Sequence, residues 1–181
     1  MKDKKENKKQ TVEKNLSGFR MPGYNEIPDV GLYLKQVVKY VNDSVGEWFD
    51  IAVTETMLSN YVKMHMVPNA IKKQYYRDQI ATMVFIVLAK TVLSLEDLQN
   101  LLPLIEKRFE KRESYERFAT TFMYTLGEFW GSEVSTDGFD IGAVFGSADE
   151  TEALLRNIVT AIVQNNYIKH SLQLLMEKNA D

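Results

Sequence analysis

Cysteine is absent from this chain, and histidine occurs only twice in 181 residues. The lack of cysteine excludes disulfides and thiolate metal sites, and it is typical of proteins of the reducing cytoplasm. His65 and His170 have no neighbour at metal-ligand spacing, so each is expected to be a packed or surface side chain. We therefore expect a cytoplasmic protein with no metal centre and no other cofactor.

Long hydrophobic runs are missing as well. A membrane-spanning helix needs about 20 consecutive apolar residues, and the unbroken apolar run from Met83 to Leu88 is far shorter. The amino-terminus is highly charged and has no apolar core, so it does not resemble a secretory signal. These absences predict a protein without a membrane-spanning segment.

No catalytic constellation is recognisable. The glycine-containing interval 131–146 lacks the Gly-Lys-Ser/Thr of a phosphate-binding loop, so its glycines are interpreted as turns. Glu106, Glu110 and Glu113 recur at helical spacing among lysines and arginines, which is typical of a salt-bridged, solvent-facing helix. We therefore expect that the protein is not an enzyme.

The charges that are present are unevenly distributed. The formal net charge is −3, yet lysine and arginine exceed the acids in residues 1–20 and 51–92. Acidic residues are in excess in 21–50 and from residue 93 onward. A basic region with an acidic rear face would orient the protein toward DNA.

Residues 1–18 are rich in lysine, asparagine and glutamate and have almost no large apolar side chain. Such a segment cannot bury enough surface to offset the entropy cost of ordering. We predict a disordered basic tail, which is either a phosphate-binding arm or only a solubilising terminus.

The stretch from Thr54 to Leu102 contains the most informative pattern. Thr54 is a good N-cap, and apolar residues recur after it at three-to-four spacing, which predicts a helix that ends before Pro68. The outer face of this helix carries Thr56, Ser59, Asn60 and Lys63.

A short basic segment follows, in which Lys72, Lys73 and Arg77 surround two tyrosines. A basic loop beside an exposed helix is a common form of phosphate contact. Nearly every residue from Asp78 to Lys90 is then apolar, which predicts a central helix. Ser94–Asp97 has the form of a capping box that starts the next helix.

This order of parts resembles the winged helix-turn-helix head of the MerR family of transcription regulators. There, a recognition helix ending in an apolar pair and proline leads to a basic wing, a tyrosine-led helix and a segment like Ser-Leu-Glu-Glu-Ile. The segments at matching places here are Met66–Pro68, Tyr75–Ile80 and Ser94–Leu98. The resemblance implies an all-α fold with a MerR-like winged helix-turn-helix head, followed here by a C-terminal helical bundle.

The chain also resembles an uncharacterised, MerR-related bacterial family of about this length, which has no established activity. This resemblance covers Phe19 to Leu102. The segments that carry it are Phe19–Pro22, Glu26–Asp29, Leu32–Val38 and Asn60–Lys63.

Two functions remain open for the head. The first hypothesis is a DNA-binding transcription regulator, in which Asn60 reads adenine in the major groove of double-stranded DNA. The alternative is a protein-interaction module without catalytic activity on a degenerate helix-turn-helix scaffold, because the helix lacks the basic residue and paired aromatics usual in the MerR family. The candidate DNA-binding residues are Thr56, Ser59, Asn60, Lys63, Lys72, Lys73 and Arg77.

Pro103 predicts a junction at 101–104, because proline suits the first turn of a new helix and breaks the interior of a continuous one. The expected division is therefore a tail (1–18), a helix-turn-helix domain (19–102) and a C-terminal region for dimerisation (103–181). A head of this size reads one half-site, so we expect a homodimer. The apolar stripe from Leu154 to Val163 is either the seam of this dimer or a face that packs inside its own subunit.

The C-terminal region also contains an aromatic set. These residues either line a pocket for a small-molecule effector or pack the core, which is the simpler alternative. The set consists of Phe118, Phe122, Trp130, Phe139 and Phe145.

Overall fold

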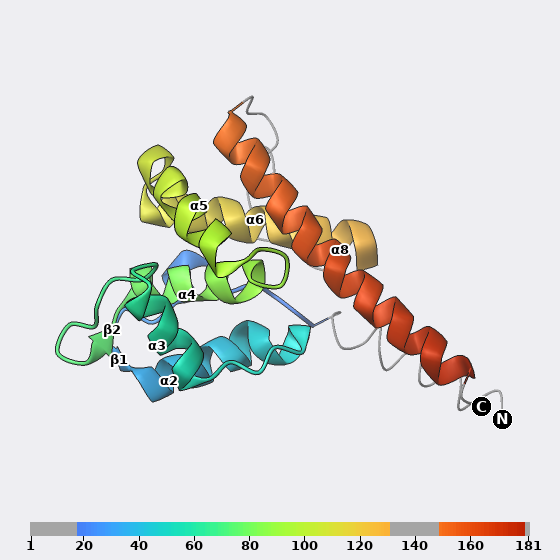
Figure 1. Cartoon of the computed structure of the whole chain (residues 1–181), viewed down its shortest axis with the longest axis horizontal. Helices are drawn as coiled ribbons and strands as arrows, with labels where there is room; N and C mark the ends of the chain where they lie inside the picture. Colours follow the sequence, from blue (N-terminus) through green and yellow to red (C-terminus); the bar gives the residue numbers. More distant parts are fainter. Residues whose placement is uncertain (1–17, 131–148, 180–181) are drawn as a thin grey trace.

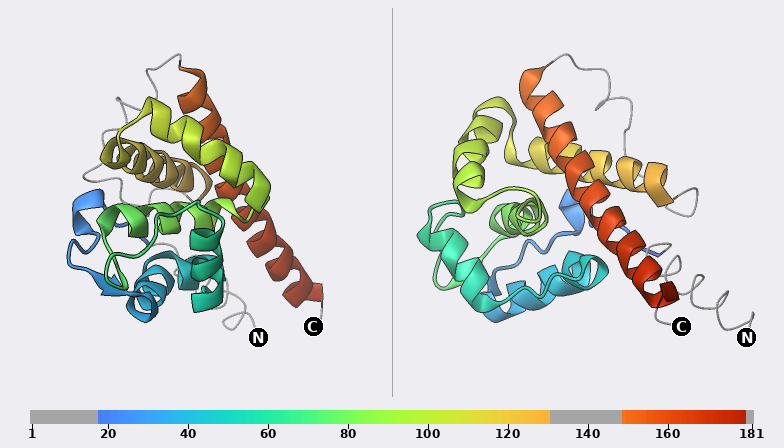
Figure 2. Two further views of the ribbon diagram at one scale, coloured as in Figure 1. Left: turned by 60° about the vertical axis from the view of Figure 1, so that its left-hand side comes forward. Right: turned by 45° about the vertical axis from the view of Figure 1, so that its right-hand side comes forward.

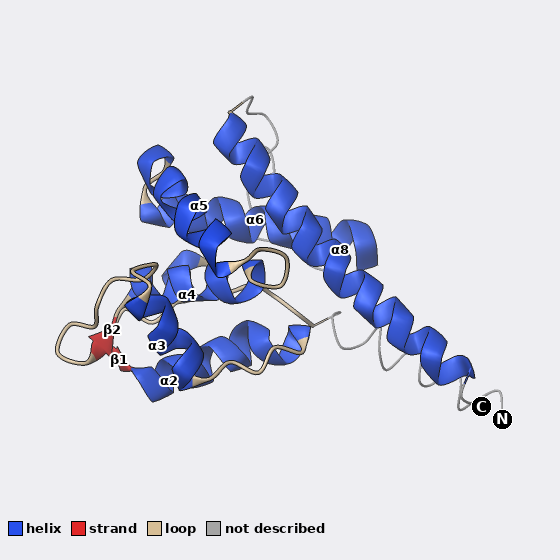
Figure 3. Ribbon diagram, in the orientation of Figure 1, coloured by secondary structure: helices blue, strands red, loops and turns tan. Residues whose placement is uncertain are grey.

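The structure, a computed structural model, describes residues 18–130 and 149–179. These residues form mostly helices with two short strands, so the all-α class is confirmed (Figures 1 and 3). The predicted tail 1–18 lies outside the described residues except for Gly18. In chain order the elements are η1 (Tyr24–Glu26), β1 (Leu32–Tyr33), α2 (Leu34–Val41), η2 (Asn42–Gly46), η3 (Glu47–Phe49), α3 (Glu55–Lys63), β2 (Gln74–Tyr75), α4 (Arg77–Ala89), α5 (Leu95–Arg108), α6 (Lys111–Trp130) and α8 (Glu150–Asn179).

The long connection from α2 to α3 is held by one asparagine. The Asn42 side chain accepts a hydrogen bond from the Val53 N–H and donates to the carbonyls of Val38 and Val53, each at 3.0 Å. Gly46 is required in this turn, since a Cβ there would lie 2.6 Å from Asn42 Oδ1 and 2.7 Å from the Ile51 carbonyl oxygen. The 42–53 connection is therefore an ordered part of the head.

α3 begins as predicted, because the Thr54 hydroxyl accepts from the Met57 N–H at 3.2 Å. It ends at Lys63, and His65 follows in a left-handed conformation with φ of 58°. Its residues Leu58 and Tyr61 are buried. The helix thus turns one face to the core and the other outward.

β2 pairs in antiparallel fashion with β1, Leu32 opposite Tyr75 and Tyr33 opposite Gln74. Ile71 also bridges to Gln74, which closes a tight turn over residues 71–74. This small sheet connects the start of α2 to the start of α4.

α4 is the central helix that its sequence predicts. Every residue from Met83 to Ala89 is buried, and Figure 2 shows α4 between the head helices and the C-terminal helices. At its start, the Gln79 side chain accepts from the Tyr76 N–H at 2.8 Å and donates to the carbonyls of Pro68 and Asn69 at 3.1 and 3.0 Å. One buried amide therefore fixes the segment after α3 onto α4.

The junction predicted at Pro103 is wrong. α5 runs from Leu95 to Arg108 with Pro103 inside it, and it ends only at Phe109, where the backbone becomes extended. Leu101, Leu102 and Ile105 are buried on both sides of the exposed proline. Their packing against the core stabilises the helix enough to offset the loss of the backbone hydrogen bond that proline cannot make.

α8 crosses α6, and the first half of α8 packs against α6 (Figure 1). Apart from the exposed Leu154, the apolar stripe from Leu154 to Val163 packs inside its own subunit, where Leu155, Ile162 and Val163 are buried. The first alternative, that this stripe is the dimer seam, is therefore wrong for the buried residues. A buried ion pair joins the two helices, with Arg117 Nη1 2.5 Å from Glu152 Oε1.

The second half of α8 extends beyond α6 (Figures 1 and 2). Large apolar side chains lie on its surface with exposed fractions of 41–64%. We call this segment the α8 arm; its exposed apolar residues are Tyr167, Ile168, Leu172, Leu175 and Met176.

Candidate functional site

Four of the candidate residues lie on α3. Thr56, Asn60 and Lys63 are exposed and Ser59 is half-buried. The Asn60 amide donates to the Met64 sulfur at 3.4 Å, and sulfur is a weak acceptor. The outer face of α3 therefore presents hydroxyl, amide and ammonium groups at the surface.

Lys72 and Lys73 form the tip of the 71–74 turn. Ile71 and Gln74 exchange both backbone hydrogen bonds, each at 2.9 Å. The two lysines between them have φ of 50° and 66°, which is the pattern of a type I′ turn and favours Asn-Gly. A left-handed residue that is not glycine costs roughly 1–2 kcal/mol, so the tip holds two exposed cations in an unfavourable backbone conformation.

Arg77 is placed differently from the two lysines. Its Nε donates to the Ile27 carbonyl at 2.8 Å, Nη1 lies 3.6 Å from Asp29 Oδ2, and the guanidinium lies 5.5 Å from the centre of the Tyr24 ring. The side chain is 22% exposed. These contacts give Arg77 a structural part in holding the segment before β1 onto α4.

The turn and α3 lie at the same end of the molecule, away from the tip of the α8 arm (Figure 1). The structure thus gathers Thr56, Asn60, Lys63, Lys72 and Lys73 on one end, which we call the α3–turn face. Ser59 belongs to the same face but is half-buried. His65, expected to be a packed or surface side chain, is exposed just after the end of α3.

The predicted effector residues that the structure describes lie in two separate places. Phe118 and Phe122 are buried, with ring centroids 5.8 Å apart. Trp130 packs instead against Tyr167 of α8, at 5.1 Å between centroids. Phe139 and Phe145 lie outside the described residues. Phe122 thus joins the core, as the simpler alternative expects.

Within residues 18–130 and 149–179, no group of three or more histidines, aspartates or glutamates is arranged to hold a metal ion. No helix described by the structure has the length and apolar character needed to cross a bilayer.

A sequence profile described as "Domain of unknown function (DUF1836)" matches residues 22–125, more than half of the chain. The chain belongs to the DUF1836 family. The expectation of an uncharacterised family is confirmed, and the matched range extends past Leu102 into α6. No curated protein and no solved structure matches the chain, so the relation of DUF1836 to MerR regulators stays a prediction.

Proposed function

We propose that this DUF1836 protein is a cytoplasmic, DNA-binding transcription regulator with a MerR-like head that contacts double-stranded DNA through the α3–turn face. The observation that carries the proposal is the lysine pair in the 71–74 turn. Backbone strain of this kind persists mainly where function requires it. Two lysines at an exposed hairpin tip suit contact with phosphate.

α3 supplies the reading element in this proposal. Its outer face places an exposed amide, Asn60, one turn before an exposed ammonium, Lys63. An asparagine amide can donate to and accept from the edge of adenine in the major groove, whereas lysine can neutralise a neighbouring phosphate or contact guanine. α3 would then specify the sequence, and the turn would supply affinity for any sequence.

A homodimer completes the proposal, because one head of this size reads one half-site. We place its interface on the α8 arm rather than on the buried stripe. Pairing of two arms in antiparallel fashion would bring Ile168 of each copy near Met176 of the other, with Lys169 near Glu177. That arrangement buries the apolar side chains and places unlike charges together.

The direct test is binding of the full chain to fluorescent duplexes of random and selected sequence across a salt series. We expect affinity to fall as salt rises, with a slope that reports the number of phosphate contacts. Lys72→Ala combined with Lys73→Ala should weaken both duplexes alike and reduce that slope by about 1 unit per lysine. Glu96→Gln, on an exposed residue of α5, is the control. Unchanged binding of the double lysine variant at every salt concentration would refute DNA contact through this face.

One observation supports the alternative that the head binds a protein. Ile71, adjacent to the lysines, is 58% exposed, and an apolar side chain at the tip suits a protein surface better than a phosphate backbone. A protein partner retained on the wild-type chain at high salt, and lost with Ile71→Ser, would favour this alternative over DNA.

A further inference from the structure

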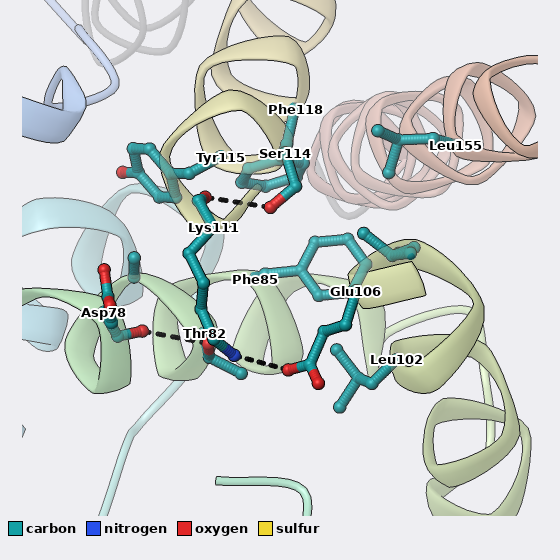
Figure 4. Close-up of a pocket in the computed structure, with 12 residues that line it drawn as sticks. Asp78, Thr82, Phe85, Leu102, Glu106, Lys111, Ser114, Tyr115, Phe118 and Leu155 are labelled. Carbon is teal, nitrogen blue, oxygen red and sulfur yellow. Dashed lines mark hydrogen bonds and ion pairs between the residues drawn. The ribbon is translucent and has the colours of Figure 1, made fainter. Parts of the chain in front are cut away.

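The cavity among α4, α5, α6 and α8 is largely closed by its own side chains. Its volume is about 50 Å³, and the Phe85 and Phe118 rings meet edge to face with centroids 5.1 Å apart. Beside them Lys111 Nζ lies 2.5 Å from Glu106 Oε1 (Figure 4). A cavity of about 150 Å³ binds benzene, so this one excludes a ligand of that size.

The small β1–β2 sheet, by contrast, has one face in the core and one in solvent. Leu32 and Tyr75 oppose each other, and Tyr75 is buried. Tyr33 and Gln74 form the next pair, and Ile71 bridges to Gln74 from the other side. Residues that oppose each other in antiparallel strands share one face of the sheet. Tyr33, Gln74 and Ile71 therefore form one row on the solvent face, which we call the outer row.

The outer row is apolar where the solvent face of an antiparallel sheet is usually polar. Tyr33 is 55% exposed and Ile71 is 58% exposed, and Val30 nearby is 70% exposed. Between them the Gln74 side chain lies against Gly31, because a Cβ at residue 31 would come within 2.8 Å of Gln74 Oε1. A group of large exposed apolar side chains of this kind marks an interaction surface.

The exposed charges next to the outer row are mostly positive. Lys72 and Lys73 lie at the tip of the 71–74 turn, and Lys35 lies in the first turn of α2, directly after β1; all three are exposed. Asp29 precedes β1, but Arg77 Nη1 lies 3.6 Å from its Oδ2. A partner that covers this surface therefore needs an apolar centre and an acidic rim.

The length of the outer row matches two turns of a helix. Neighbouring strands lie about 4.8 Å apart, so Tyr33 and Ile71, on either side of Gln74, are separated by about 10 Å across the sheet. Residues i and i+7 of an α-helix are separated by about 10.5 Å along its axis, with i+4 between them on the same face. A helix laid across the strands would place its i and i+7 side chains against Ile71 and Tyr33.

From these observations we infer that the outer row binds an acidic amphipathic helix of a partner protein. The apolar side chains of the helix cover Tyr33 and Ile71, and its carboxylates face Lys72 and Lys73. The same two lysines carry the proposed contact with phosphate, so a bound helix displaces DNA from the 71–74 turn. The helix site goes beyond the proposed function and does not itself require DNA binding.

The probe is an alanine-based helical peptide with leucine at positions i, i+4 and i+7 and glutamate at the other surface positions. Its matched control carries lysine in place of every glutamate. Each is titrated into the full chain without DNA and followed by two-dimensional NMR. We expect saturable shifts of β1, β2 and the 71–74 turn with the glutamate peptide, and binding at least about tenfold weaker with the lysine peptide. Absence of saturable binding of the glutamate peptide, or equal binding of the lysine peptide, would overturn the inference.

Substitutions in the outer row test the location of the site. Tyr33→Ser and Ile71→Ser should each weaken binding of the glutamate peptide about tenfold, because an apolar side chain no longer becomes buried. Both positions are exposed, so the fold should tolerate the changes. The matched control is Leu104→Ser, which replaces a 54% exposed leucine of α5 and should leave binding unchanged. Undiminished binding to both outer-row variants would place the peptide elsewhere and contradict the inference.

Competition with a fluorescent duplex separates the helix site from the proposed DNA contact. The glutamate peptide should displace the duplex from the parent chain but not from Ile71→Ser, which keeps both lysines and therefore its salt-dependent DNA affinity. Simultaneous binding of peptide and duplex would refute the shared use of the lysines. If Ile71→Ser and Tyr33→Ser weaken duplex binding while no peptide binds, the outer row contacts DNA and the helix inference is refuted. Peptide binding without any duplex binding would refute the proposed DNA-binding function and leave the helix site standing.

Discussion

The two halves of α8 have opposite surroundings although they form one continuous helix. In the first half, Ile162 is 2% exposed and packs within its own subunit, whereas Ile168, fewer than two turns later, is 63% exposed. The first half also takes part in a buried ion pair through Glu152. Helical spacing of apolar residues therefore does not by itself distinguish a buried helix face from an exposed one, since most large apolar side chains of the first half are buried and those of the second half are exposed.

The largest expected effect comes from the buried ion pair of the first half. Arg117→Met leaves the Glu152 carboxylate, of which 2% of the side chain is exposed, without its nearest cation. Breaking a buried pair by removing one partner costs about 3–5 kcal/mol, measurable as a lower urea midpoint of unfolding. The matched control is Arg112→Met, which removes an exposed pair with Glu116 and should cost less than about 1 kcal/mol. Equal losses of unfolding free energy in both variants would contradict a special contribution of the buried Arg117–Glu152 pair.

A second prediction compares the same truncation, isoleucine to alanine, in the two halves of α8. Ile162→Ala should lower the free energy of unfolding by about 2–5 kcal/mol, because it removes buried methyl groups and leaves a cavity. Ile168→Ala should change it by less than about 0.5 kcal/mol when measured at concentrations where the protein is monomeric. Comparable losses would mean that the arm packs against its own subunit.

The third prediction concerns assembly through the α8 arm. Leu172→Glu combined with Leu175→Glu should convert the proposed dimer to a monomer in sedimentation equilibrium, because charges would replace the apolar contact. The stability of the monomer should stay within about 0.5 kcal/mol of the parent, since both positions are exposed. A variant that remains dimeric would exclude the arm as the interface. Gln173→Glu, also exposed, controls for the added negative charge.

Local signals in the sequence predicted most of the fold. Thr54 and Ser94 gave the correct starts of α3 and α5, because capping depends on residues within one turn. Pro103 gave a wrong helix end. Proline locally disfavours a continuous helix, but the burial of the residues on both sides of Pro103 keeps α5 helical through it. β1 was not predicted, since a two-residue strand has no periodicity and pairs with Tyr75 far along the chain.

The candidate site was predictable in part. The exposure of Asn60 and Lys63 follows from helical spacing, and the structure places them as expected. The engagement of Arg77 with Ile27 and Asp29 was not predictable, because that segment has no periodic pattern to place it beside α4. The left-handed conformation of the lysine pair was likewise hidden, since lysine is not a residue that indicates a type I′ turn.

The smallest expected effect, and the only stabilising one, comes from the 71–74 turn. Replacing Lys72 by Asn and Lys73 by Gly supplies the residues that a type I′ turn favours, and should stabilise the protein by about 1–2 kcal/mol by relieving left-handed strain. The same change removes two exposed cations. If the turn contacts phosphate, affinity for random and selected duplexes should fall together, and the salt slope should decrease by about 2 units.

Lys72→Gln with Lys73→Gln separates the two effects, because it removes the charges and keeps the strained backbone. It should lower DNA affinity as much as the Asn-Gly pair while leaving the thermal midpoint near that of the parent. A gain in stability with unchanged DNA affinity for the Asn-Gly variant would show that the lysines are only a strained surface turn. The DNA contact would then have to be sought on α3 alone, and the strain at the tip would have another cause.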